Sequence, residues 1–122
     1  MTDTNVAVLV VEDEPLMRMD IVDILEAGGF VVFEAANADE AIAILVEHPE
    51  IRALFTDIDM PGSMDGLKLA AAVRDRWPPI KIIVTSGHRY IREESLPDGG
   101  RFFSKPYDPK EIANTIREMV AA

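Results

Sequence analysis

The chain alternates short apolar segments with longer segments in which apolar residues recur every three or four positions. The apolar segments carry the β-branched and aromatic residues that favour strands. The five expected strands are VAVLVV (6–11), FVVFEA (30–35), IRALFT (51–56), IKIIVT (80–85) and RFFS (101–104). The first and fourth are almost continuously apolar, which is typical of parallel strands that are buried on both faces.

Amphipathic patterns of helical period lie between these strands and after the last one. They cover residues 14–29, 37–49, 66–79 and 108–122. Pro15 and Pro109 suit the first turn of a helix, and Asn37 and Asp108 suit the N-cap position. Glu40 stands three residues after Asn37, which is capping-box spacing. The alternation of strands and helices predicts an α/β fold with a parallel sheet, right-handed crossovers and helices on both faces.

The residues at the carboxyl ends of the expected strands are candidates for chemistry, because ligands of an open parallel sheet bind at this edge. Glu12 and Asp13 follow the first strand, Asp57 follows the third, Thr85 ends the fourth and Lys105 follows the fifth. Each motif alone is a weak signal. Their convergence from four separate segments predicts one site.

The charges of this set indicate what the site does. Three carboxylates at one edge repel one another, by about 1–4 kcal/mol for each close pair. A hard divalent cation relieves that repulsion, and oxygen ligands suit Mg²⁺. Such a cation also neutralises phosphoryl oxygens and assists attack by a carboxylate. With the Lys105 ammonium and the Thr85 hydroxyl, the set predicts a site that accepts a phosphoryl group on an aspartate.

Composition and charge narrow the class of protein. The 122 residues suffice for one domain, and the shares of 48% hydrophobic and 28% charged residues are ordinary for a soluble globular protein. With 12 basic and 22 acidic residues the net charge is −10, which disfavours nucleic-acid binding. The sequence has no cysteine, no basic leader and no apolar run of the roughly 18 residues that a membrane span needs. We expect a cytoplasmic protein that binds neither nucleic acid nor membrane.

Taken together, these motifs resemble the receiver (CheY-like) domain of two-component response regulators. The matching motifs are VVEDE (10–14), TDIDMPG (56–62), VTSG (84–87) and FFSKPY (102–107). The resemblance runs from about residue 5 to residue 121, and it implies a flavodoxin-like, doubly wound five-stranded parallel sheet of order 2-1-3-4-5. We expect one receiver domain over residues 1–122, with no output domain.

The resemblance implies a role for each acidic residue of the site. Asp57 would be the phosphoacceptor, and the donor would be a sensor histidine kinase or a phosphotransfer protein. Asp13, Asp57 and the backbone carbonyl of Asp59 would bind Mg²⁺ (or Mn²⁺), and Glu12 would act through water. No organic cofactor is implied.

The remaining matching residues would contact the phosphoryl group or transmit its presence. Thr85 and Lys105 would touch the group, and Thr85 with Phe102 would form the conformational switch. The resemblance also implies a cis Lys105-Pro106 bond. The output would be contact with a downstream protein target. The domain would not be an enzyme beyond accepting the group and losing it by autodephosphorylation.

Three features depart from the family pattern. The loop 60–66 is one residue longer than usual, and Asp59 places a negative charge beside the phosphorylation site. The segment 87–100 is short and poor helix material, because Leu96 is followed by Pro97 and the charges oppose the helix dipole. We expect at most one or two loose turns there.

Two other functions remain open on the residues alone. TDIDM also resembles the Asp-x-Asp motif of haloacid-dehalogenase-type phosphatases, with Asp57 as nucleophile and Asp59 as general acid. That family places the motif on the first strand, whereas here it follows the third. The second alternative is an atypical receiver that binds a partner without being phosphorylated.

Overall fold

The computed structural model describes residues 6–97 and 99–121, so residue 5 of the expected core lies outside the described residues. The chain forms a five-stranded sheet in which every neighbouring pair of strands is parallel. The strands are β1 (Ala7–Val11), β2 (Val31–Ala35), β3 (Ile51–Asp57), β4 (Lys81–Ser86) and β5 (Arg101–Ser104). Their order is β2-β1-β3-β4-β5, which confirms the predicted topology.

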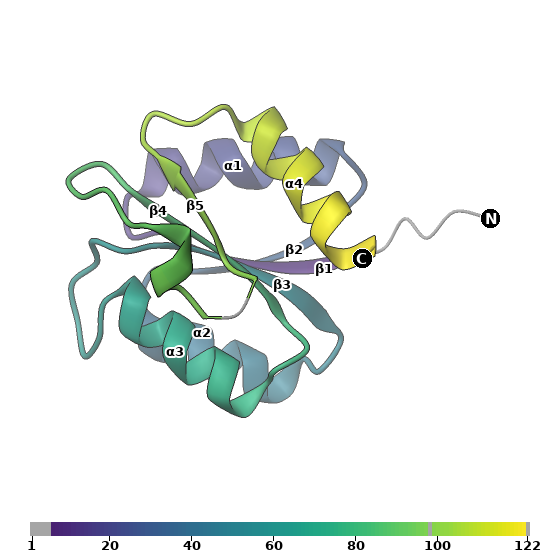
Figure 1. The fold of residues 1–122 in the computed structure, drawn as a ribbon. Helices are drawn as coiled ribbons and strands as arrows, with labels where there is room; N and C mark the ends of the chain where they lie inside the picture. The colour runs from purple at the N-terminus through teal and green to yellow at the C-terminus, as the bar shows by residue number, and fades with distance from the viewer. Residues whose placement is uncertain (1–5, 98, 122) are drawn as a thin grey trace.

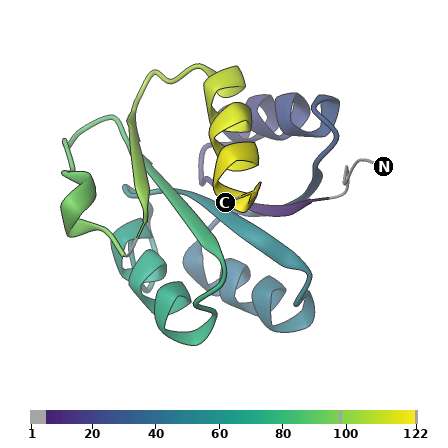
Figure 2. The same ribbon diagram turned by 45° about the vertical axis from the view of Figure 1, so that its right-hand side comes forward.

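Four α-helices of the described residues cover the sheet (Figure 1). They are α1 (Pro15–Ala27), α2 (Ala38–Glu47), α3 (Gly66–Arg76) and α4 (Pro109–Ala121). α1 and α4 lie on one face of the sheet and α2 and α3 on the other, and the turned view in Figure 2 shows the same division. None of these helices has the length and apolar character needed to cross a membrane. The doubly wound α/β architecture is confirmed.

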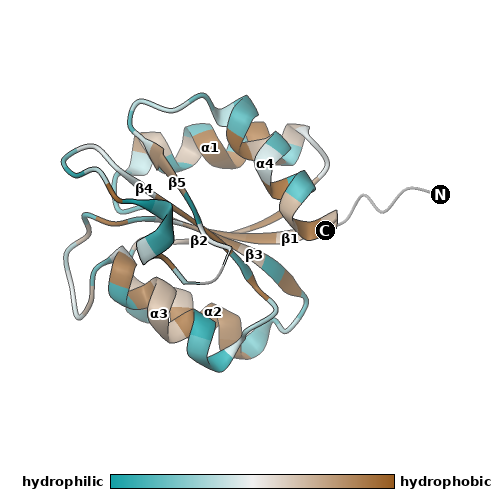
Figure 3. Cartoon of the chain, in the orientation of Figure 1, coloured by the Kyte–Doolittle hydropathy of each residue, from teal (hydrophilic) through white to brown (hydrophobic). Residues whose placement is uncertain are grey.

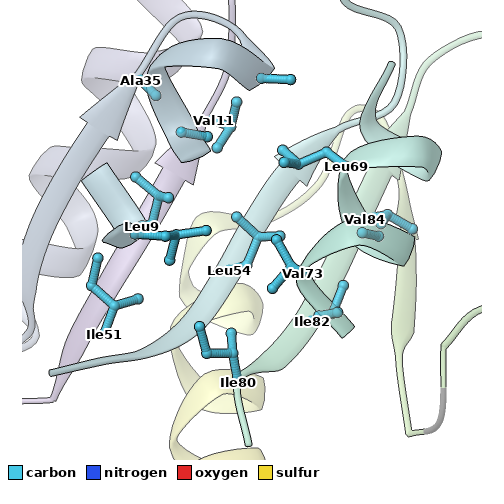
Figure 4. Packing of buried hydrophobic residues seen from close by; sticks show 14 of the residues in the cluster. Leu9, Val11, Ala35, Ile51, Leu54, Leu69, Val73, Ile80, Ile82 and Val84 are labelled. Atoms are coloured by element: carbon cyan, nitrogen blue, oxygen red, sulfur yellow. The ribbon is translucent and has the colours of Figure 1, made fainter. Parts of the chain in front are cut away.

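Each face of the central strands packs against its own pair of helices, because successive side chains of a strand point to opposite faces. Val8 and Val10 of β1 belong to a core cluster with residues of α1 and α4. Leu9 and Val11 belong to a cluster with residues of α2 and α3, where Figure 4 shows Leu54 of β3 beside Leu9. The burial of β1 over its whole length follows from its continuous apolar run, which stands out in Figure 3.

Side chains cap the starts of several helices, among them α2 and α3. Asn37 Oδ1 accepts a hydrogen bond from the N–H of Glu40 at 2.9 Å, as the N-cap of α2 should. Glu40 Oε1 accepts from the N–H of Ala36 at 2.8 Å, one residue before the N-cap, so the predicted capping box is shifted by one position. Asp65 caps α3 by accepting from the N–H of Lys68 at 3.0 Å. This cap starts α3 directly beside the end of β3.

The segment between β4 and β5 contains one short helical turn, η1 (Glu93–Ser95), which is a 3₁₀ helix. The expectation of a weak element at this place is confirmed. Gly99 has a positive φ of 76°, which suits the predicted turn, and Asp98 lies outside the described residues. Tyr90 is 79% exposed and its ring meets the edge of Phe102, with ring centroids 5.7 Å apart. The hydrophilic colour of this turn in Figure 3 shows why it adds little to the core.

Candidate functional site

Four segments bring their strand-end residues to one edge of the sheet. Glu12 follows β1, and Asp57 is the last residue of β3. Thr85 of β4 lies beside Asp57, because the two residues are partners in the parallel ladder. Lys105 follows β5, and its N–H donates to the carbonyl of Ser86 in β4 at 3.0 Å. The structure therefore assembles residues that are up to 93 positions apart in the sequence.

Lys105 lies between two buried carboxylates. Its Nζ is 3.2 Å from Glu12 Oε1 and 3.1 Å from Asp57 Oδ2. The Glu12 and Asp57 side chains are 1% and 4% exposed, and that of Lys105 is 18% exposed. Carboxylates so far from water require a partner, because an unpaired buried charge is costly. Lys105 is the counter-ion of both.

Burial changes the ionisation of all three groups. It raises the pKa of Glu12, and the negative charge of Asp57 adds to the rise. It also raises the pKa of Asp57, although the attraction of Lys105 opposes the shift. Burial lowers the pKa of Lys105, but the two carboxylates outweigh it and the net shift is upward. The carboxylates are thus disfavoured in their charged form, and a further cation would relieve them.

The two carboxylates that contact Lys105 belong to an acidic cluster. Glu12, Asp13 and Asp57 each offer a carboxylate oxygen, and these oxygens lie within 4.8 Å of one another. Hard oxygen donors at this spacing suit a divalent cation such as Mg²⁺. The donor set therefore fits the cation that the sequence predicts.

The hydroxyl of Thr85 has no hydrogen-bond partner within the described part of the chain, although the residue is fully buried. Leaving a buried hydroxyl unpaired costs about 1–3 kcal/mol. A group bound next to Asp57 would be in position to pair with it, because Thr85 is the ladder partner of Asp57. The unpaired hydroxyl thus indicates that a group bound to the Asp57 side chain would carry atoms able to form a hydrogen bond with Thr85.

Asp59 is fixed by contacts that the sequence analysis missed. Its carboxylate accepts a hydrogen bond from Ser86 Oγ at 2.6 Å, and Arg89 Nη2 is 3.5 Å from its other oxygen. The signal in the sequence was Ser86 itself, since a polar residue directly after Thr85 at the end of a buried strand needs a partner. The predicted role of the Asp59 carbonyl in metal binding stays a prediction.

Phe102, the predicted switch residue, lies in β5 outside the carboxylate cluster. It is half-buried, it pairs in the ladder with Val84, and its N–H donates to Glu93 Oε2 at 3.0 Å. The residue is therefore one ladder position away from Thr85. The Lys105-Pro106 bond is cis, which confirms that expectation.

Gly66, at the start of α3, lies against the backbone of the candidate phosphoacceptor. A Cβ on Gly66 would stand 2.0 Å from the carbonyl oxygen of Asp57 and 2.8 Å from Cα of Ile58. Both atoms belong to the main chain, so no side-chain rotation relieves the contact. Only glycine lets α3 begin so close to the end of β3.

Comparison with known proteins agrees with this geometry. The sequence model of the response regulator receiver domain matches residues 8–117. The chain is 37% identical over 120 residues to the sensor kinase CckA of Brucella abortus, covering 95% of this chain but 13% of that protein. It is 32% identical over 118 residues to the response regulator receiver protein CpdR of the same organism, covering 94% of this chain and 97% of CpdR.

A solved structure supports the same conclusion. The receiver domain of the hybrid histidine kinase CckA superposes with a TM-score of 0.80 at 31% identity, covering 93% of this chain and 98% of the other. The fold, the strand-end residues and the sequence comparison therefore agree. This chain belongs to the response regulator receiver domain family of two-component systems.

Proposed function

We propose that the chain takes part in a phosphorelay by accepting a phosphoryl group on Asp57. The observation that carries the proposal is the buried, unpaired hydroxyl of Thr85 beside Asp57. The ammonium of Lys105, 3.1 Å from Asp57 Oδ2, supports it, because it places a cation where phosphoryl oxygens would arrive.

In the proposed step, a carboxylate oxygen of Asp57 attacks the phosphorus of a phosphohistidine on a sensor histidine kinase or phosphotransfer protein. An O–P bond forms while the P–N bond breaks, and the imidazole nitrogen leaves with the electron pair and takes up a proton. Later attack by water on phosphorus would release inorganic phosphate and restore the carboxylate. The domain would thus undergo this cycle itself, without being an enzyme for an external substrate.

Two side chains would hold the transferred group. Lys105 would exchange its contact with the carboxylates for one with a phosphoryl oxygen. Thr85 would donate its hydroxyl hydrogen to another oxygen and so gain the partner that it lacks. Both contacts are stronger toward the charged phosphoryl group than toward a neutral acceptor.

The acidic cluster would hold Mg²⁺ (or Mn²⁺). Asp13, Asp57 and the carbonyl of Asp59 would be the direct ligands, and Glu12 would act through water. When bound, the cation would neutralise charge on the phosphoryl oxygens. The support for this assignment is the spacing of the carboxylate oxygens and the raised pKa of Glu12 and Asp57, which burial causes.

The output would be a change of surface that a protein target reads. Movement of Thr85 toward the phosphoryl group would be passed to Phe102 and to the short turn η1 between β4 and β5. The relatives CckA and CpdR carry the names sensor kinase and response regulator receiver protein, which supports a kinase-linked role. The net charge of −10 supports a protein target over nucleic acid.

Intact-mass measurement after incubation with acetyl phosphate and Mg²⁺ tests the proposal. We expect the mass of one phosphoryl group to be added to the wild type and none to Asp57→Asn, which lacks the nucleophilic oxygen. An unmodified wild type would contradict the proposal and favour the phosphorylation-independent receiver. Many turnovers of a phosphomonoester would instead favour the phosphatase.

Replacement of Asp13 tests the cation site. Asp13→Ala is expected to weaken Mg²⁺ binding by roughly 10- to 100-fold, and by more than Glu12→Ala does, because a direct ligand contributes more than a water-mediated one. In chelator the same variant should be more stable by about 1 kcal/mol, since one repelling carboxylate is gone. Calorimetric titration and thermal melts measure the two effects.

The control for this measurement is Asp23→Ala, which removes an equal charge from the exposed face of α1. It should leave Mg²⁺ affinity unchanged. If Asp13→Ala melts below the wild type in chelator, the argument from repulsion is wrong.

A further inference from the structure

The carboxylate of Asp59 is held toward β4, although Asp59 stands only two residues after Asp57. Ser86 Oγ donates to Asp59 Oδ2 at 2.6 Å, within the short range typical of strong hydrogen bonds from a hydroxyl to a carboxylate. The Asp59 N–H meanwhile points to Asp57 Oδ1 at 3.4 Å. The side chain of Asp59 thus contacts Ser86, whereas its main chain contacts Asp57.

Ser86 is itself fixed, so it cannot easily release Asp59. The residue is 1% exposed at the end of β4. Its oxygen accepts hydrogen bonds from the N–H groups of His88 and Arg89, at 3.1 and 3.0 Å. Because both lone pairs of the hydroxyl are used in this way, its single hydrogen is left for Asp59.

Arg89 supplies the charge that Asp59 requires. Its Nη2 is 3.5 Å from Asp59 Oδ1 and 3.8 Å from Asp65 Oδ2. Asp65 is the N-cap of α3, so the guanidinium joins the segment after β4 to the loop between β3 and α3. The Arg89 side chain is 44% exposed, and ion pairs so exposed add little to stability. The physical effect of Arg89 therefore falls on the charge of the neighbouring site and not on the stability of the fold.

The site already contains Glu12, Asp13 and Asp57 against one ammonium, that of Lys105. An unneutralised carboxylate at position 59 would add a fourth negative charge next to the residue that has to receive an anionic group. We propose that Arg89, acting with Ser86, is a positioning residue that holds the Asp59 carboxylate on the β4 side and cancels its charge, so that anionic phosphoryl donors reach Asp57. This inference rests on the proposed function.

The test compares rates of phosphorylation by acetyl phosphate at saturating Mg²⁺. Arg89→Gln is expected to slow phosphorylation by about three- to tenfold at low salt, because Asp59 then repels the donor. The defect should shrink as salt screens the charges, and it should be smaller with phosphoramidate, a donor of lower negative charge. A merely structural role of Arg89 would produce neither dependence.

Two further variants distinguish the effect of the position of Arg89 from the effect of the net charge of the protein. Arg92→Gln removes the same charge from the same segment and should phosphorylate at nearly the wild-type rate. Asp59→Asn combined with Arg89→Gln should restore the rate, because residue 59 then carries no charge to be neutralised. Thermal melts verify that all variants are folded.

The outcomes distinguish this inference from the proposed function. Equal rates for Arg89→Gln and Arg92→Gln, or a defect that persists in the double variant, would overturn the role of Arg89 while leaving phosphorylation of Asp57 intact. Absence of any phosphoryl uptake by the wild type would overturn the proposed function, and the inference with it.

Discussion

Gly66→Ala is expected to lower the free energy of unfolding by roughly 3 kcal/mol or more, a large effect for one methyl group. The added Cβ would meet the carbonyl oxygen of Asp57 at 2.0 Å and Cα of Ile58 at 2.8 Å. Since both are main-chain atoms, either α3 or the end of β3 must move. That movement displaces Asp57 itself, so phosphoryl uptake should fall together with stability.

Urea denaturation followed by circular dichroism measures the loss, and Gly87→Ala is the matched control. A Cβ on Gly87 would meet only the Lys105 side chain at 3.6 Å, which is ordinary contact. The control should therefore change the stability by no more than about 0.5 kcal/mol. Equal midpoints for the two variants would show that α3 tolerates a side chain at its start, against the geometry.

Lys105→Met should destabilise the metal-free protein by roughly 3 kcal/mol at neutral pH, because it leaves two buried carboxylates without their counter-ion. Methionine keeps most of the aliphatic stem of the lysine, so the change is chiefly one of charge. The side chains of Glu12 and Asp57 are 1% and 4% exposed, so water cannot reach them to solvate their charges once the ammonium is gone. Mg²⁺ should recover part of the loss, since it supplies charge to the same carboxylates.

The pH dependence of this deficit has a definite sign. Burial raises the folded-state pKa of Glu12 and Asp57 above the ordinary values of 4.5 and 3.8, and loss of Lys105 raises both further. A carboxyl group with a raised folded pKa contributes stability below its unfolded pKa and loses it as pH rises through the folded pKa. The variant should therefore approach the wild type near pH 4 and fall behind it toward neutrality.

Melts over this pH range, in chelator, test the argument, with Lys81→Met as the control. Lys81 is exposed at the start of β4, so the same substitution there should cause a small deficit that does not vary with pH. A deficit of Lys105→Met that stays constant from pH 4 to pH 7 would show that the lysine matters through packing, not charge.

The sequence predicted most of the fold because the strong signals were local. The continuous apolar run of residues 6–11 has no stable position except between two helical layers, and the structure buries it there. The grouping of Asp57, Thr85 and Lys105 followed from a rule of topology, since parallel strands deliver their carboxyl ends to one edge. The weakness of the element between β4 and β5, where η1 is a single turn, was also predictable, because Leu96 is followed by Pro97 and the charges oppose the helix dipole.

The contacts within the site were harder to predict, because they depend on side-chain geometry across elements. Nothing in the spacing of residues shows that Lys105 contacts Glu12 as well as Asp57. The same holds for the bond from Ser86 to Asp59, since the two lie on different strand ends 27 positions apart. Whether two such side chains form a bond depends on differences of a few tenths of an ångström in their separation, and the periodicity and composition of the sequence do not determine these.

The carboxylate of Glu93 bears on how copies of this protein behave at high concentration. β5 is an edge strand, and exposed edges invite pairing with the strands of other molecules. Glu93 Oε2 accepts from the main-chain N–H of Phe102 and from Nε of Arg101, so it occupies a donor on that edge. An incoming strand would have to displace a charged group before it could add to the sheet. The short turn η1, which contributes little to the core, would therefore oppose aggregation through β5.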